Sequence, residues 1–260
     1  MQTRISQLAC AALVLALAAA CSDGGATVSL AFSTRELNSV QQGDSTVVIR
    51  GSDTVIIRRV ELVLREIELE LLNDDCPDSS GVDDDACEEF STSIQLVDLP
   101  LGNATDKTIT IEIPAGVYDE LEFEIHKPDD STDAAFIAAH PDFADVSIRV
   151  SGTFSQGGTR SDFVYITDLN EEQEIELDPP LDVTADGAIN VTLRLDVGTW
   201  FLAAGGSALV DPASANNGGP NENLVENNIR ASIDAFHDDD SDGLDDDHED
   251  DDGGSSHDSP

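Results

Sequence analysis

Basic side chains are scarce in this chain, in which 12 Lys and Arg stand against 54 Asp and Glu among 260 residues. The formal net charge is therefore -42 at pH 7, with histidine counted as neutral. A chain with this charge is repelled by phosphate backbones and by bare anionic surfaces. Nucleic acid is thus excluded as an expected partner.

Aromatic side chains are also few, with nine Phe, one Trp and two Tyr. An exposed aromatic platform for sugar binding has only Trp200, Phe201, Tyr118 and Tyr165 as candidates, and core packing suits most of these rings better. The hydrophobic fraction of 40% is enough for one substantial core, and the length fits one or two domains. The shortage of rings therefore disfavours a carbohydrate-binding module.

An apolar run from Leu8 to Ala20 follows Arg4 at the N-terminus. It has the length of a secretory signal and is too short to span a bilayer. The run ends in the segment Leu17-Ala18-Ala19-Ala20-Cys21-Ser22. Small residues before a cysteine resemble the lipobox of bacterial lipoproteins.

This resemblance implies that residues 1–20 are a lipoprotein signal peptide and that Cys21 becomes the lipid-modified N-terminus. Residues 21–26 are then a lipid-anchored linker, and acyl chains on Cys21 bind the protein to a membrane. Ser22 after the cysteine resembles the pattern for export to the outer membrane, and either face of that membrane stays open. The alternative is ordinary cleavage near Ala20, which releases a soluble protein.

Cysteine is rare, and Cys76 and Cys87 are the only pair outside the predicted signal peptide and its lipidation site. In an oxidising compartment they are predicted to form a disulfide, which contributes about 3 kcal/mol by closing the acidic loop between them. The alternative is a metal or redox pair, but there is no Cys-x-x-Cys and no adjacent histidine.

Apolar residues between residues 27 and 203 recur mainly at every second position, a pattern typical of half-buried strands. The phase slips at Arg65-Glu66, which predicts a β-bulge, and Gln156-Gly157-Gly158-Thr159 predicts a hairpin turn. No alternation of strands with helices appears. The sequence therefore predicts an all-β fold, an antiparallel two-sheet β-sandwich. Strands are expected at residues 28–32, 47–49, 60–71, 94–97, 109–113, 121–125, 146–150, 163–166, 174–177 and 189–197.

The segment Ile111-Glu112-Ile113-Pro114-Ala115-Gly116-Val117-Tyr118, followed by the strand at residues 121–125, resembles a family of uncharacterised bacterial lipoproteins. Their domain is an immunoglobulin- or transthyretin-like sandwich. The resemblance implies this fold and an envelope location, and it brings no established reaction. In physical terms, Pro114 ends strand pairing and Gly116 permits a turn.

The character of the chain changes after residue 203. Residues 204–222 are rich in Gly, Asn and Pro and predict a loop. Residues 223–236 carry apolar side chains at three- to four-residue spacing, which predicts one amphipathic helix. Residues 237–260 are rich in Asp and have almost no large apolar side chain, so a disordered acidic tail is expected.

A calcium-binding pattern spans Asp238 to Glu249, with acids at positions 1, 3 and 5, glycine at position 6 and Glu at position 12. It resembles EF-hand loops and the calcium repeats of thrombospondin type 3 and dockerin. The resemblance departs at position 8, which is Asp245, and in the lack of a second helix. The alternatives are a counter-ion sponge or a chance match in an acidic tract. The predicted ligands are the side chains of Asp238, Asp240, Asp242, Asp246 and Glu249 and the carbonyl of Leu244.

No nucleophile elbow, phosphate-binding loop, dinucleotide motif or paired-histidine zinc helix is present. We therefore expect a non-enzymatic, lipid-anchored envelope protein, an interaction or adhesion module with a weak calcium site and an unknown protein or glycan partner. One alternative is a carbohydrate- or peptide-binding surface lipoprotein. A hydrolase is the other, and it requires two buried carboxylates that converge in a cleft.

Overall fold

The structure is a computed structural model, and it describes residues 26–34, 40–41, 43–72, 93–101, 105–184, 187–238, 240 and 243. The predicted signal peptide, the predicted lipidation site Cys21 and the predicted disulfide between Cys76 and Cys87 lie outside these residues. Strands dominate the described chain, and the prediction of an all-β sandwich is confirmed.

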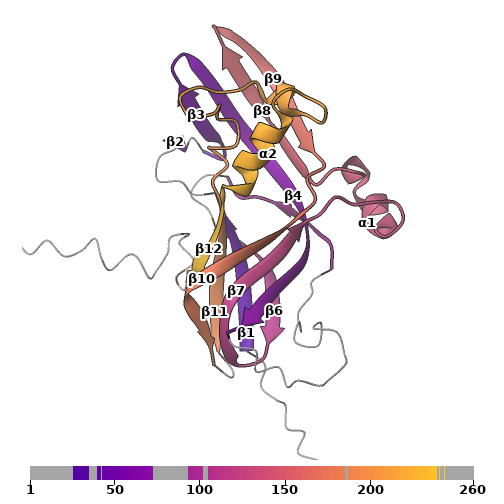
Figure 1. The fold of residues 1–260 in the computed structure, drawn as a ribbon, viewed down its shortest axis with the longest axis vertical. Helices are drawn as coiled ribbons and strands as arrows, with labels where there is room; N and C mark the ends of the chain where they lie inside the picture. The colour runs from indigo at the N-terminus through magenta and orange to yellow at the C-terminus, as the bar shows by residue number, and fades with distance from the viewer. Residues whose placement is uncertain are drawn as a thin grey trace, which may run out of the picture.

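The strands form two sheets (Figure 1). The smaller sheet has the order β12-β11-β1-β6, with β1 Ala26–Ser33, β6 Thr105–Ile113, β11 Ala188–Leu195 and β12 Ile233–His237. The larger sheet contains β2 Val40–Gln41, β3 Thr46–Arg50, β4 Asp53–Leu71, β5 Gln95–Asp98, β7 Gly116–Ile125, β8 Ile148–Gln156, β9 Thr159–Thr167 and β10 Glu171–Val183. Among the described strand pairs, β1 with β11 is parallel and the others are antiparallel.

The 19-residue strand β4 organises the larger sheet, because β3, β5, β7 and β8 all pair with it. In Figure 1, β3, β8 and β9 lie around its upper half and β7 and β10 beside its lower half. The predicted bulge is confirmed: Glu66 has a φ of 53°, and the register with β7 shifts between Arg65 and Glu68. The extra residue keeps Leu64 and Ile67 both in the core, although an odd number of positions separates them.

The predicted hairpin is also confirmed, since β8 and β9 pair from Ile148 with Thr167 to Gln156 with Thr159. The turn residues Gly157 and Gly158 have φ values of 57° and 83°. A two-residue turn with positive φ at both positions matches the right-handed twist of the flanking strands, and glycine adopts it without strain.

The predicted helix over residues 223–236 is wrong in its second half. Helix α2 spans Glu222–Arg230 and buries Val225 and Ile229, and β12 then pairs antiparallel with β11. Ile233 and Phe236 fit a strand as well as a helix in so short a run. Hydrogen bonds to the edge of β11 stabilise the strand. This is a tertiary effect, so the spacing of apolar residues along the chain does not predict it.

Three short elements were not predicted: β2, helix α1 Ala134–Ala139 and the 3-10 turn η2 Pro141–Phe143. The predicted loop at residues 204–222 contains a further 3-10 turn, η3 Pro212–Ala215. Asn216 follows η3, and its side-chain Oδ1 accepts a hydrogen bond from the backbone nitrogen of Ile166 at 2.8 Å. This loop and α2 are thereby fixed beside β9.

Candidate functional site

The first residue of the predicted tail, His237, is the last residue of β12, so the tail starts one residue later than predicted. Asp238, the first residue of the predicted calcium pattern, is buried with 0% of its surface exposed. Its Oδ2 accepts hydrogen bonds from the Thr192 hydroxyl on β11 at 2.6 Å and from the backbone nitrogen of Gly243 at 3.0 Å. Its own backbone nitrogen donates to the carbonyl of Asn190 at 3.1 Å. The start of the tail is therefore attached to the smaller sheet.

Gly243, the sixth position of the pattern, has a φ of 82° and is buried. Glycine adopts this left-handed conformation without the penalty of a Cβ atom. The hydrogen bond from Gly243 to Asp238 thus brings positions 1 and 6 together, as a cation loop requires. Asp240 is exposed within this turn. The other predicted ligands, Asp242, Leu244, Asp246 and Glu249, lie outside the described residues.

A second acidic feature was missed in the sequence: glutamates of three neighbouring strands align across the larger sheet. Glu68 of β4, Glu122 of β7 and Glu174 of β10 are paired in one row, and Glu70, Glu120 and Glu176 are paired in the next. In a third row, Glu124 of β7 lies between Arg65 of β4 and Glu172 of β10. We call these eight glutamates the glutamate face. Each strand's alternation was visible in the sequence, but the register that aligns the strands was not.

The charges of the glutamate face change its ionisation. A hydrogen bond with Glu172, partial burial and the charges of Glu172, Glu70 and Glu68 raise the pKa of Glu122 to about 8. Burial, followed by the charges of neighbouring acids, also raises the pKa of Glu120. Like charges directly opposite on adjacent strands are destabilising. The fold therefore retains a proton here at pH values at which an isolated glutamate is ionised.

Replacement of Glu122 by glutamine is expected to make stability less dependent on pH. Because the folded pKa of about 8 lies above the ordinary value of 4.5, the wild type loses stability as pH rises from 4.5 to 8. Glu122→Gln should therefore be more stable than the wild type in alkali, by about 1 kcal/mol, since solvent screens these charges. Urea denaturation at about pH 5 and about pH 9 measures the difference.

The matched control for this prediction is Asp182→Asn on β10, which removes the same charge opposite Val117 rather than opposite an acid. Its stability relative to wild type should be similar at both pH values. An equal gain in alkali for both variants would assign the effect to net charge alone and not to the glutamate face.

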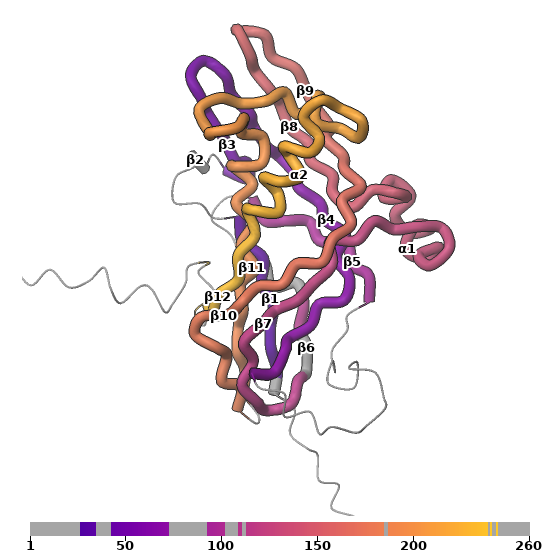
Figure 2. Tube along the Cα trace, viewed as in Figure 1, coloured from indigo at the N-terminus to yellow at the C-terminus, as the bar shows by residue number. Residues whose placement is uncertain are grey.

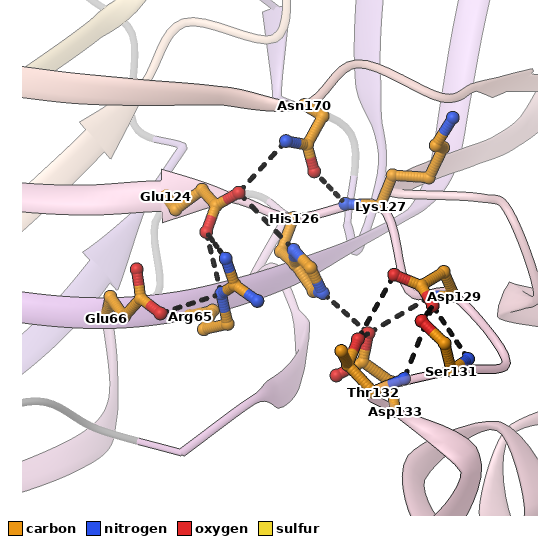
Figure 3. A network of polar contacts seen from close by, with 10 residues as sticks. All are labelled: Arg65, Glu66, Glu124, His126, Lys127, Asp129, Ser131, Thr132, Asp133 and Asn170. Carbon is orange, nitrogen blue, oxygen red and sulfur yellow. Dashed lines mark hydrogen bonds and ion pairs between the residues drawn. The ribbon is translucent and has the colours of Figure 1, made fainter.

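A network of polar contacts holds the loop after β7 (Figure 3). His126, with 4% of its surface exposed, has its Nε2 2.8 Å from Oδ2 of Asp133 and its Nδ1 3.4 Å from Oε1 of Glu124. The guanidinium of Arg65 contacts the other oxygen of Glu124 at 2.6 Å, and Asn170 donates to Glu124 Oε1 at 3.0 Å. The network thereby connects β4, β7, the β9–β10 turn and the loop before α1.

Asp129 and Asp133 close that loop (Figure 3). Burial acts to raise the pKa of Asp133, but hydrogen bonds from His126, the Asp129 backbone and Thr132 outweigh it and lower the pKa. Hydrogen bonds from the side chain and backbone of Ser131 lower the pKa of Asp129 to about 2. Each ring nitrogen of the buried His126 faces a carboxylate, so the imidazole is turned toward the protein rather than toward solvent. This geometry suits a structural connection between loop and sheet.

The four aromatic candidates for a sugar-binding platform are all buried, with Tyr118 and Phe201 at 2% exposure and Tyr165 and Trp200 at 0%. Trp200 donates its indole hydrogen to the Ser232 hydroxyl at 2.8 Å, and Tyr118 donates to the carbonyl of Pro114 at 3.0 Å. The latter bond closes the turn of the Pro-Ala-Gly-x-Tyr motif. These rings stabilise the core and one turn, and their buried faces form no platform for a sugar.

The chain matches no protein-family model, no curated protein and no solved structure. Within the described ranges, no helix has both the length and the apolar character needed to cross a membrane. The resemblance of residues 111–118 to a lipoprotein family and that of residues 238–249 to calcium loops stay predictions. No family is assigned to the chain.

Proposed function

We propose that the protein is a non-enzymatic lipoprotein of a bacterial outer membrane, an interaction or adhesion module that binds calcium at its acidic C-terminus. The turn from Asp238 to Gly243 carries this proposal. A strongly acidic chain with a signal peptide suits an extracellular medium in which calcium is plentiful. The sandwich supplies a rigid scaffold, and its connecting loops are the natural contact points for a partner.

The anchoring part of the proposal rests on the sequence from Leu17 to Cys21. Acyl chains on Cys21 would give stable attachment, because each buried methylene contributes about 0.8 kcal/mol and more than one chain is present. Mass spectrometry of the membrane-extracted protein tests this point. A soluble protein with a free N-terminus would contradict it.

The calcium part is supported by the hydrogen bond between Asp238 and Gly243 and by the positive φ of Gly243. Calcium needs six to eight oxygen ligands on a tightly curled chain. The structure attaches the first position to Thr192 and turns the chain at the sixth, so part of the ordering cost is met by the fold. Asp240, Asp242, Leu244, Asp246 and Glu249 are then the further ligands that we propose. Affinity in the range of extracellular modules, about 10⁻⁴ to 10⁻³ M, is expected.

Replacement of Asp240 by asparagine or of Glu249 by glutamine is expected to weaken calcium binding at this site about tenfold, because each removes one charged ligand. Isothermal titration calorimetry of the intact protein, carried out at a fixed ionic strength, measures the change. The matched control is Asp252→Asn, which removes one tail carboxylate outside the proposed loop and should leave the affinity unchanged.

A second comparison separates a specific loop from a counter-ion sponge. Residues 239–260 are scrambled at constant composition in the intact chain, which keeps the net charge and Asp238. Loss of the saturable site supports the loop. Equal calcium binding by the scrambled chain would show that only nonspecific attraction to acidic residues exists.

A further inference from the structure

Helix α2 lies beside β9 (Figure 2). Three carboxylates of α2 and of the turn after β9 meet there. Asp168 belongs to the turn after β9, and Glu222 and Glu226 lie one helical turn apart on α2. One oxygen atom from each of the three side chains lies within 4.8 Å of the others. Like charges at i and i+4 destabilise a helix, so this arrangement is unfavourable unless a cation compensates it.

The basic side chains around these carboxylates compensate them only in part. The ammonium of Lys127 is 3.5 Å from Oδ2 of Asp168, and the guanidinium of Arg230 is 3.9 Å from Oε2 of Glu226. Arg230 also forms a close ion pair with Glu171 and is therefore shared. Four carboxylates thus share two cations, which leaves an excess of two negative charges.

Tyr165 provides an independent observation that points to a ligand. The residue is 0% exposed, and no described atom meets its hydroxyl with the distance and angle of a full hydrogen bond, the nearby Thr167 hydroxyl included. Buried polar groups are rarely left without a partner, because burial removes their contacts with water. This buried hydroxyl therefore points to a ligand beside it that can contact its oxygen atom.

The direction of Tyr165 follows from the strand. Residues two apart on a strand lie on the same face, and Thr167 of that face donates its hydroxyl hydrogen to Oε1 of Glu226 at 2.7 Å. The ring of Tyr165 packs edge-on against Phe201, with centroids 5.4 Å apart, which fixes its orientation. Burial raises the pKa of Tyr165, and a weak interaction with the Thr167 hydroxyl lowers it. The charges of Glu226 and Glu222 raise the pKa further, and the charge of Arg230 lowers it. The phenol therefore lies within the field of these carboxylates.

We propose that Asp168, Glu222 and Glu226, together with the neutral hydroxyl of Tyr165, bind a divalent cation that prefers oxygen ligands, with calcium as the favoured ion. Carboxylate and hydroxyl oxygens suit calcium, whose coordination shell tolerates irregular geometry and is completed by water. The charge of the ion equals the local excess of negative charge. Bound there, the ion connects α2 to the β9–β10 turn. This site is separate from the tail and goes beyond the proposed function.

Terbium(III) tests the proposal, because it occupies calcium sites and emits when a nearby tyrosine is excited. The intact protein should give tyrosine-sensitised terbium emission that added calcium removes. Asp168→Asn and Glu222→Gln should each weaken terbium binding about tenfold. Tyr165→Phe keeps all three carboxylates and should lose most of the emission. The matched control is Asp162→Asn on β9, whose carboxylate faces solvent and should not affect the signal.

The outcomes separate this site from the tail. Asp240→Asn should leave the sensitised emission unchanged even where it weakens calcium binding measured by calorimetry, so either proposal can fail alone. Absence of sensitised emission from the wild type, or emission that calcium does not displace, overturns the site. Circular dichroism shows which of Asp168→Asn and Glu222→Gln folds. An unchanged terbium affinity in a folded variant of the two also overturns the site. If neither variant folds, full terbium emission from Tyr165→Phe overturns the site.

Discussion

Replacement of Gly152 by alanine is expected to prevent the sandwich from folding. A Cβ atom at this position of β8 would lie 2.0 Å from the carbonyl oxygen of Ile56 on β4 and 3.0 Å from the ring of Phe163. The backbone has no room to move away, because β8 pairs with β4 on one side and with β9 on the other. We expect a loss of more than about 4 kcal/mol, which exceeds ordinary overpacking because a main-chain atom is contacted. Loss of the cooperative urea transition, followed by the fluorescence of the single tryptophan, measures it.

Gly157→Ala in the β8–β9 turn is the matched control for Gly152→Ala. Its Cβ would meet nothing within 4 Å, so only the positive φ of 57° is penalised. A cost of about 1 kcal/mol and a retained transition are expected. Similar unfolding midpoints for the two variants would contradict the close approach of β8 to β4.

Removal of the Asp133 carboxylate is expected to release the loop after β7 from the sheet. Asp133→Ala leaves the buried His126 without its contact at 2.8 Å and also removes the acceptor for the Asp129 backbone and the Thr132 hydroxyl. Loss of a buried charged hydrogen-bond partner costs about 3 kcal/mol. Urea denaturation near neutral pH measures this cost. The exposed neighbour Asp130, changed to alanine, should alter stability by less than about 0.5 kcal/mol.

The effect of Asp133→Ala should depend on pH in a defined direction. Because the folded pKa of Asp133 lies below the ordinary value of 3.8, the carboxylate contributes its full stability above that value. The contribution is lost as pH falls through the lower, folded pKa. The difference between wild type and variant should therefore be constant above about pH 5 and smaller in acid. A difference that grows on acidification would mean that Asp133 is not a hydrogen-bonded carboxylate in the fold.

Features that depend on neighbouring residues could be predicted from the sequence. The bulge at Arg65-Glu66 follows from a phase change within one strand, and the hairpin at Gly157-Gly158 follows from the φ values that only glycine adopts freely. Both are decided by a few consecutive residues, so the sequence contains the physical cause. The all-β class is predictable for the same reason, because each strand carries its own alternation.

Features that depend on distant partners could not be predicted in the same way. Ile233 to His237 form a strand because β11 offers an edge, and the five residues themselves fit either state. The glutamate face requires the register of β4, β7 and β10, which is fixed by long-range packing. The cluster of Asp168, Glu222 and Glu226 joins segments more than fifty positions apart. The predicted calcium pattern was accessible from sequence because its residues are consecutive, although only Asp238, Asp240 and Gly243 of it lie among the described residues.

The outer strand of the glutamate face, β10, has a consequence for how copies of the protein behave when crowded. β10 pairs with β7 on one side, and among the described residues no other strand pairs with its outer edge. An edge without a strand partner can recruit strands from other molecules and start aggregation. Here Pro179 and Pro180 remove two backbone donors from the strand, and the glutamates beside them repel an identical edge. The same charges that strain the sheet therefore keep neighbouring molecules from joining it edge to edge.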